Sequence, residues 1–163
     1  MSWTNQWIPP GPAGTALTLN QMATLIRRAA LLEIVRQTAV GLSAPPLATS
    51  PAEFLEAVDQ FCRQYVVVVD EAEEMLFAPE LMLAQIQQNG RAFGDCDDVT
   101  DLGLSLMSTM GIECRLVGFQ PGGMDRFSHV FGECFIGGQW VRFDPTIDPH
   151  TFFPAGTRMT VDI

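Results

Sequence analysis

Apolar positions recur with a helical period over the first third of the chain. Between residues 19 and 40, apolar side chains return every three or four positions, and the charged side chains fall largely on other faces. This spacing predicts one long, sparsely charged helix over residues 19–40, with Gly41 as its C-terminal cap. A helix with so little charge is expected to pack against a partner surface.

Proline-rich segments lie on both sides of this predicted helix. Residues 7–12 contain three prolines, which exclude helix or central strand and predict an extended arm. Residues 41–51 combine proline with small residues and predict a linker. We therefore expect an arm, helix and linker over residues 1–50 and a separate domain over residues 51–163. The first segment is expected to serve association, and the domain is expected to fold without it.

Three further helices are predicted in the first half of the domain. The first follows the capping residue Ser50 and extends to about residue 65, and the second covers residues 79–90. The third is capped by Asp95 and covers residues 96–110. The pattern after residue 110 then changes to that of strands.

The predicted strands are Cys114–Phe119, Phe127–Ile136 and Gln139–Phe143. Two glycines, Gly137 and Gly138, separate the last two strands and predict a tight hairpin turn. A closing strand is expected over Met159–Ile163.

The composition is that of a folded domain: 47% of the 163 residues are hydrophobic and 17% are charged. The net charge is −10, from 19 acidic residues against 9 arginines, and lysine is absent. Nucleic acid and anionic lipid are therefore not expected as partners, because their binding relies on clustered basic residues. Chemistry that needs a lysine is excluded within this chain.

No stretch approaches the roughly 18–20 consecutive apolar residues of a membrane helix. The longest β-branched run, residues 66–69, is interpreted as buried core. The first residues lack the basic and then apolar pattern of a signal peptide, so we expect a cytoplasmic protein with reduced thiols. The four cysteines are too widely spaced for a CxxC pair; they are Cys62, Cys96, Cys114 and Cys134.

Three residues in the second half carry candidate chemistry. Cys96 opens a predicted helix, where the helix dipole and free amides favour a thiolate. With the turn at residues 137–138, facing residues of the hairpin have numbers that sum to about 275. This register places Asp144 diagonal to His129 on the same face, within reach of the imidazole. Nucleophile, base and orienting acid are the parts of a catalytic triad.

Four motifs in this order resemble the transglutaminase-like domain of bacteria and their phages. They are Gly-Asp-Cys-Asp-Asp at 94–98, Gly-Ile-x-x-Arg at 111–115, His-Val-aromatic-x-Glu at 129–133, and Trp-Val-x-x-Asp-Pro-Thr at 140–146. The resemblance covers about residues 80–146, and more loosely the chain from residue 51. It implies that Cys96 is the nucleophile, His129 the general base and acid, and Asp144 the orienting carboxylate.

The resemblance also implies an α+β, papain-like fold in which the nucleophile's helix packs on a small antiparallel sheet, here with an N-terminal helical extension. Such sites usually add a side-chain donor to the oxyanion hole. No motif identifies that donor; the candidates are Tyr65, Gln85, Gln88 and Asn89.

Structural interpretations of the same residues stand beside the catalytic ones. Cys62, Cys114 and Cys134 fit inert buried thiols, and His150 fits a surface loop. The acids around Cys96 fit helix capping better than a calcium loop. A zinc site from Cys96, Cys114, His129 and Cys134 lacks closely spaced ligands, so neither a metal nor a cofactor is expected.

Two functions follow from these residues. In the first, Cys96 attacks a peptide or carboxamide carbonyl of a protein or peptide substrate and forms a thioester. Water then gives hydrolysis and an amine gives transglutamination; hydrolysis is favoured because a small chain has little means of excluding water. In the second, the protein is structural, for example a phage virion component that docks through residues 1–50, and the triad is vestigial.

Overall fold

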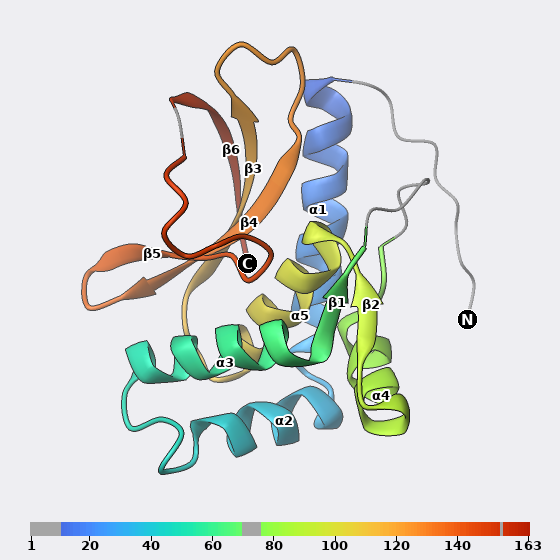
Figure 1. The fold of residues 1–163 in the computed structure, drawn as a ribbon, viewed down its shortest axis with the longest axis vertical. Helices are drawn as coiled ribbons and strands as arrows, with labels where there is room; N and C mark the ends of the chain where they lie inside the picture. The colour runs from blue at the N-terminus through green and yellow to red at the C-terminus, as the bar shows by residue number, and fades with distance from the viewer. Residues whose placement is uncertain (1–10, 70–75, 154) are drawn as a thin grey trace.

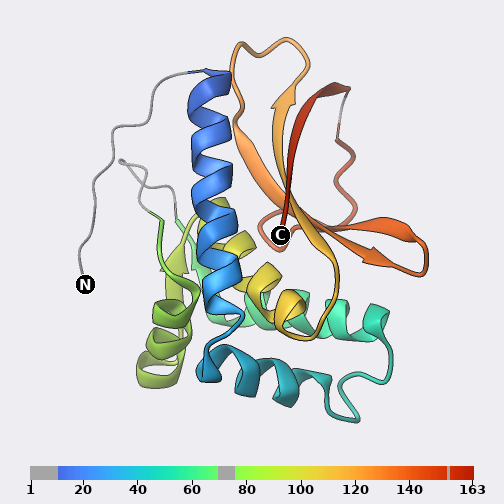
Figure 2. The same cartoon turned by 180° about the vertical axis from the view of Figure 1, so that it is seen from behind.

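A four-stranded antiparallel sheet packs one face against the central helix α5 (Cys96–Thr109), and the other helices surround α5 (Figures 1 and 2). The structure is a computed structural model, and it describes residues 11–69, 76–153 and 155–163. The predicted α+β arrangement, with the Cys96 helix on an antiparallel sheet, is confirmed. Among the described residues, no helix is both long enough and apolar enough to cross a bilayer.

In the described residues, four helices accompany α5, and six strands form two sheets. The helices are α1 (Pro12–Ala29), α2 (Glu33–Ser43), α3 (Pro51–Tyr65) and α4 (Pro79–Asn89). The strands are β1 (Val66–Val68), β2 (Ala92–Gly94), β3 (Cys114–Pro121), β4 (His129–Ile136), β5 (Gln139–Phe143) and β6 (Gly156–Asp162). The larger sheet has the order β5-β4-β3-β6, and β1 pairs with β2 in a separate parallel sheet.

The hairpin register predicted from the two-glycine turn is confirmed. Phe143 pairs with Gly132, and Gln139 pairs with Ile136. Gly137 and Gly138 have φ values of 62° and 84°, which suit a tight turn that twists with its strands. The closing strand is also present as β6, although it begins earlier than predicted and pairs with β3.

The prediction of one helix over residues 19–40 is wrong, because two helices occupy this region. The chain breaks between α1 and α2, where Leu32 takes an extended conformation with φ −85° and ψ 141°. The Thr109 hydroxyl at the end of α5 donates to the Ala30 carbonyl at 2.7 Å, which satisfies part of the exposed backbone. Gly41 is not a cap, since α2 continues to Ser43.

The two N-terminal helices contribute to the main hydrophobic core. Their fully buried side chains join the cluster that includes α5; they are Leu19, Met22, Ala23, Ile26, Ala29, Val35 and Ala39. We expected no internal role for this segment, and the packing shows one. A boundary after residue 50 stays a prediction, and the proline-rich arm lies largely outside the described residues.

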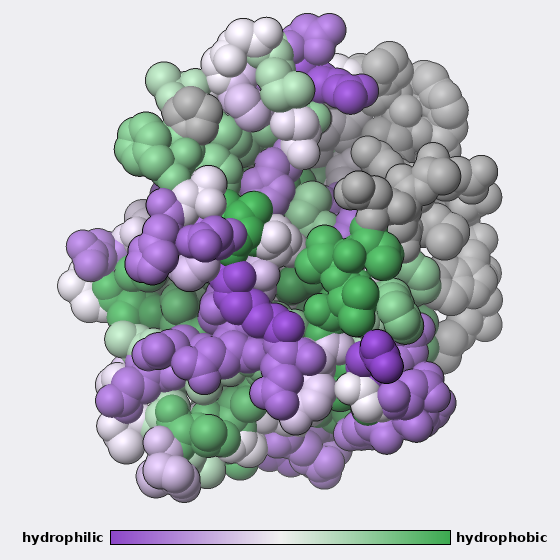
Figure 3. Space-filling view, in the orientation of Figure 1, coloured by the Kyte–Doolittle hydropathy of each residue, from purple (hydrophilic) through white to green (hydrophobic). Residues whose placement is uncertain are grey.

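The short parallel pair β1–β2 was not predicted. Val66 is buried, but Val67 and Val68 are 38% and 48% exposed, so the interpretation of the whole run as core is wrong. Figure 3 shows hydrophobic residues gathered over β1 and β2, and Phe93 is also exposed, at 51%. The strand β2 leads directly into the start of α5 and therefore determines where Cys96 lies.

Two glycines allow α5 to approach the sheet closely. A Cβ atom on Gly103 would lie 2.1 Å from the Phe143 ring, and one on Gly132 would lie 2.6 Å from the Leu104 side chain. At each position an added Cβ atom would be too close to a neighbouring side chain, so that side chain or the backbone would have to shift.

We expect Gly103→Ala to lower the free energy of unfolding by about 1–3 kcal/mol, because the added methyl group overpacks the interface with Phe143. The matched control is Gly41→Ala, also within a helix, where no atom lies within 4 Å of the added Cβ. The control should raise stability by about 0.4–1 kcal/mol. Urea denaturation measures both changes, and equal effects of the two substitutions would contradict this account of the α5–sheet contact.

Candidate active site

The start of α5 is held by a reciprocal pair of aspartates. Oδ1 of Asp95 accepts the backbone N–H groups of Asp97 and Asp98 at 2.9 and 3.3 Å. In return, Oδ2 of Asp98 accepts the Asp95 N–H at 3.3 Å, which completes a capping box. The predicted cap is therefore confirmed. The cap uses the amides of Asp97 and Asp98 and leaves out that of Cys96.

Asp98 also ties a distant segment to this helix start. Its side chain is fully buried, and Oδ1 accepts the N–H of Phe77 at 2.7 Å, just before α4. No sequence motif indicated this contact, because the two residues lie 21 positions apart and only the fold brings them together. Asp95 and Asp98 thus hold the backbone around Cys96 in place.

Cys96 is the first residue of α5, and its thiol is half-buried. The thiol donates to Oδ1 of Asp97 at 3.4 Å. Burial raises the pKa of the thiol above its ordinary value, and the negative charges of Asp97 and Asp95 raise it further, while the backbone N–H of Val130 acts in the opposite direction. Burial and these two carboxylates therefore act against the thiolate that the helix start favours.

His129 and Asp144 form the predicted contact across the hairpin. Nε2 of His129 lies 2.7 Å from Oδ2 of Asp144, at the end of β5. The Thr146 hydroxyl donates to the other carboxylate oxygen, Oδ1, at 2.8 Å. The imidazole is 16% exposed and the carboxylate 1% exposed, so both lie mostly out of water. With Nε2 donating to the carboxylate, Nδ1 is the ring nitrogen left to take up a proton.

The Cys96 thiol reaches β4 at the residue after His129, since it lies against the Val130 amide. The structure thus brings the α5 start to the strand that carries the His129–Asp144 pair. In the resting arrangement the thiol donates to Asp97 and not to the imidazole.

Two phenylalanine rings lie near the imidazole. The centroids of Phe131 and Phe153 lie 6.0 and 5.8 Å from that of His129. Phe153 comes from the segment after β5, for which the sequence offered no motif; its adjacent Phe152 and Phe153 were the one available signal. Both rings therefore contribute to the partial burial of the imidazole.

The other three cysteines are buried, as expected for inert thiols. Burial raises the pKa of Cys62. Cys114 and Cys134 face each other across β3 and β4 with their Sγ atoms 3.6 Å apart. The two sulfurs thus contact each other.

One group of possible metal ligands occurs in the described part of the chain. Asp95, Cys96 and Asp97 each place one ligand atom within 4.8 Å of the others. Oδ1 of Asp95 is used by the helix cap, and Oδ1 of Asp97 accepts the thiol. The expected capping role of these acids therefore accounts for their positions.

The side-chain candidates for the oxyanion hole lie on two helices, α3 and α4. Tyr65 lies at the end of α3 against Phe61, with a ring-centroid distance of 5.1 Å. The three amide candidates, Gln85, Gln88 and Asn89, lie on α4. Within the described ranges, no hydrogen bond links any of the four to Cys96.

Asp101, one of the acids near Cys96 that we expected to serve the start of α5, is a buried carboxyl. It is fully buried in α5, and in the described part of the molecule neither oxygen has a hydrogen-bond partner. Burial raises the pKa of this carboxyl well above its ordinary value, and the charges of Asp97, Asp98 and Asp95 add to the effect. Burial and these charges therefore favour the protonated form of Asp101.

Comparison with known proteins gives the family. The sequence pattern of the transglutaminase-like superfamily matches residues 36–145, so the chain belongs to this superfamily. The match includes Cys96, His129 and Asp144. No curated protein matches the chain.

Two solved structures have a similar fold. One is a candidate protease from Parabacteroides distasonis ATCC 8503, with a TM-score of 0.60 and 13% identity over 89% of this chain. The other is a candidate cysteine protease from Cytophaga hutchinsonii, with a TM-score of 0.50 and 16% identity over 90% of this chain. The chain corresponds to 29% and 53% of the lengths of these two proteins.

We expect Asp97→Asn to lower the pKa of the Cys96 thiol, because the substitution removes the charge that raises it most after burial itself. Alkylation of Cys96 by iodoacetamide at pH 7 should become about 3–10-fold faster, the change that a shift of half to one pKa unit gives. Mass spectrometry of each cysteine measures the rates. Glu113→Gln, at an exposed acid before β3, is the control, and a slower or unchanged Cys96 rate in Asp97→Asn would refute the assignment.

The raised pKa of Asp101 also makes stability depend on pH. The folded protein keeps a proton that the unfolded chain releases above about pH 4, so the wild-type free energy of unfolding should fall as pH rises from 4 to 8. Asp101→Asn removes this titration, so its stability relative to wild type should increase across the same range. Urea denaturation at each pH tests the difference, with Asp125→Asn as a control for net charge. Parallel curves for wild type and Asp101→Asn would rule out a neutral Asp101.

Proposed function

We propose that this protein is a cysteine hydrolase that cleaves peptide or carboxamide bonds through a thioester on Cys96. The observation that carries the proposal is the His129–Asp144 hydrogen bond of 2.7 Å, held next to the helix start where Cys96 lies against β4. Membership of the superfamily supports the same roles, because its pattern spans all three residues.

The first step is attack by a thiol that is neutral at rest. Nδ1 of His129 accepts the Cys96 proton as Sγ bonds to the substrate carbonyl carbon, and Asp144 stabilises the imidazolium through Nε2. The negative charge moves to the carbonyl oxygen. The Cys96 backbone N–H, which the helix cap leaves available, is placed to donate to that oxygen.

The second step releases the amine. His129 returns its proton to the leaving nitrogen, the carbon–nitrogen bond breaks, and the acyl group stays on Cys96 as a thioester. A water molecule then attacks the thioester, with His129 again acting as base, and the acid product leaves. An amine in place of water would complete a transglutamination instead.

We favour hydrolysis of a protein or peptide over amine transfer. The imidazole keeps 16% of its side-chain surface accessible, so water reaches the base in the resting site. The two similar structures are a candidate protease and a candidate cysteine protease, which agrees with hydrolysis.

The decisive test is selective alkylation of Cys96. Iodoacetamide should modify Cys96 faster than the three buried cysteines, and His129→Ala should slow this reaction near neutral pH more than Asp144→Asn does, because His129 takes the proton directly. Rates per cysteine come from mass spectrometry. Hydrolysis of a peptide library should be lost in Cys96→Ser, which keeps a similar shape.

Equal alkylation rates at all four cysteines, or no effect of His129→Ala, would overturn the enzymatic proposal. The alternative, a structural or assembly protein with a vestigial site, would then stand. Association through residues 1–50, or presence in a virion, would be the property to measure in that case.

A further inference from the structure

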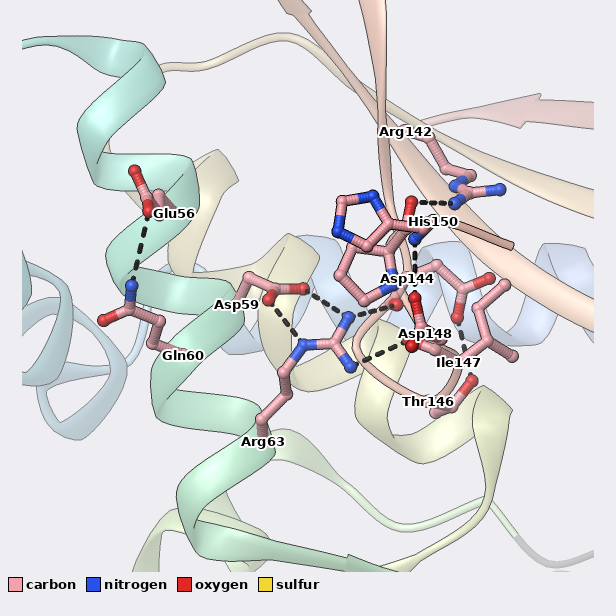
Figure 4. Close-up of polar contacts among 11 residues, drawn as sticks. Glu56, Asp59, Gln60, Arg63, Arg142, Asp144, Thr146, Ile147, Asp148 and His150 are labelled. Atoms are coloured by element: carbon pink, nitrogen blue, oxygen red, sulfur yellow. Dashed lines mark hydrogen bonds and ion pairs between the residues drawn. The ribbon is translucent and has the colours of Figure 1, made fainter. Parts of the chain in front are cut away.

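Arg63 in the last turn of α3 contacts the chain directly after β5, more than 80 residues away in the sequence. Its NH2 group donates to the backbone carbonyl of Asp144 at 3.0 Å, and its NH1 group donates to that of Ile147 at 2.8 Å (Figure 4). Both acceptors belong to the turn Asp144-Pro145-Thr146-Ile147. The guanidinium therefore bridges the two ends of this turn.

The same guanidinium is held in orientation by its own helix. Asp59, one turn earlier on α3, accepts from Nε at 2.6 Å and from NH2 at 3.3 Å. The side chains of Arg63 and Asp59 are 31% and 24% exposed, so the ion pair is only partly screened by water. Figure 4 shows the planar group between the helix and the turn, with donors directed to both sides.

The turn that Arg63 holds determines where the Asp144 carboxylate points. Both carboxylate oxygens are already engaged, by His129 at 2.7 Å and by the Thr146 hydroxyl at 2.8 Å. Pro145 restricts Asp144 to an extended backbone. Arg63 supplies the remaining constraint, since it holds the Asp144 carbonyl from the opposite side of the turn.

We propose that Arg63 is a positioning residue for the His129–Asp144 pair: it clamps the 144–147 turn onto α3 so that the carboxylate keeps the imidazole in the orientation that accepts the Cys96 proton. This role rests on the proposed function for its catalytic consequence, although its effect on the imidazole can be measured without catalysis. Lysine cannot replace it, because one ammonium group cannot span Asp59 and both carbonyls in the planar geometry of the guanidinium.

The test compares Arg63→Gln with Arg36→Gln. Arg36 on α2 makes a similar two-nitrogen pair with Glu33, at 3.1 and 2.7 Å, but it lies on the protein surface and has no contact with the 144–147 turn. The two substitutions therefore remove the same charge from the same kind of pair. Thermal unfolding of both variants establishes that each is folded at the temperature used.

The first readout is the imidazole itself, by ¹⁵N NMR of His129 through a pH titration. The charged and titratable groups on the elements around it are Asp144 after β5, Cys96 and Asp97 on α5, Arg142 and Arg158, which stack over the Phe153 and Phe131 rings, and Glu133, which pairs with Arg158. Asp59 and Arg63 approach from α3. Arg63→Gln removes the hydrogen bonds that Arg63 makes to Asp144 and Asp59, and of these two Asp144 is the one hydrogen-bonded to the imidazole. We expect the fraction of the Nε2–H form to fall in Arg63→Gln, because a displaced carboxylate no longer holds that proton, with no change in Arg36→Gln.

The second readout is the rate at which Cys96 is alkylated near neutral pH. We expect this rate to be about tenfold lower in Arg63→Gln, because a small misplacement of a catalytic group produces a loss of this size. Guanidinium ion at millimolar concentration should restore part of the rate in Arg63→Ala, while ammonium ion should not. An unchanged Nε2–H fraction of His129 in a folded Arg63→Gln, or equal effects of Arg63→Gln and Arg36→Gln, would overturn the proposal. If wild-type Cys96 proves unreactive, the proposed function fails, and the His129 titration still decides the role of Arg63.

Discussion

The close packing of α5 on the sheet is the constraint on which the rest of the molecule depends. Glycine at positions 103 and 132 removes the side chains that would otherwise separate the helix from Phe143 and from β4. The start of α5 consequently meets β4 at Val130, and Cys96 lies next to the residue that follows His129. The buried side chains of α1 and α2 complete the core around the same helix, so the N-terminal third supports the geometry of the candidate site.

The acids around Cys96 have two opposite effects: they stabilise the start of α5 and disfavour the thiolate. Asp95 and Asp98 cap α5 and fasten the segment before α4, which stabilises the helix start. The same cluster of acids, together with burial, raises the pKa of the thiol and of the Asp101 carboxyl, which favours the protonated form of both. In the proposed mechanism a protonated thiol attacks only when a base takes its proton, so the proposed role of the imidazole depends on its orientation.

That orientation is built from parts that are distant in the sequence. The Asp144 carboxylate is engaged on one side by His129 and on the other by Thr146, while Arg63 holds its backbone from α3. Phe153 comes from the loop after β5 and covers the imidazole. Helix, strand and loop therefore converge on one hydrogen bond.

The features that could be predicted from the sequence are those formed between residues close together in the chain. These were the Asp95 cap, the two-glycine turn, the hairpin register that brings Asp144 to His129, and the motifs of the superfamily. The break near Leu32 could not be predicted, because no proline or glycine marks it. The β1–β2 pairing could not be predicted either, because strands of three residues are too short for a periodic pattern of apolar residues. Four features could be seen only in the folded structure: the surroundings that raise the pKa of Cys96, the burial of Asp101, and the contacts of Arg63 and Phe153. Burial and long-range contacts set pKa values and side-chain positions, and neither is encoded in local spacing.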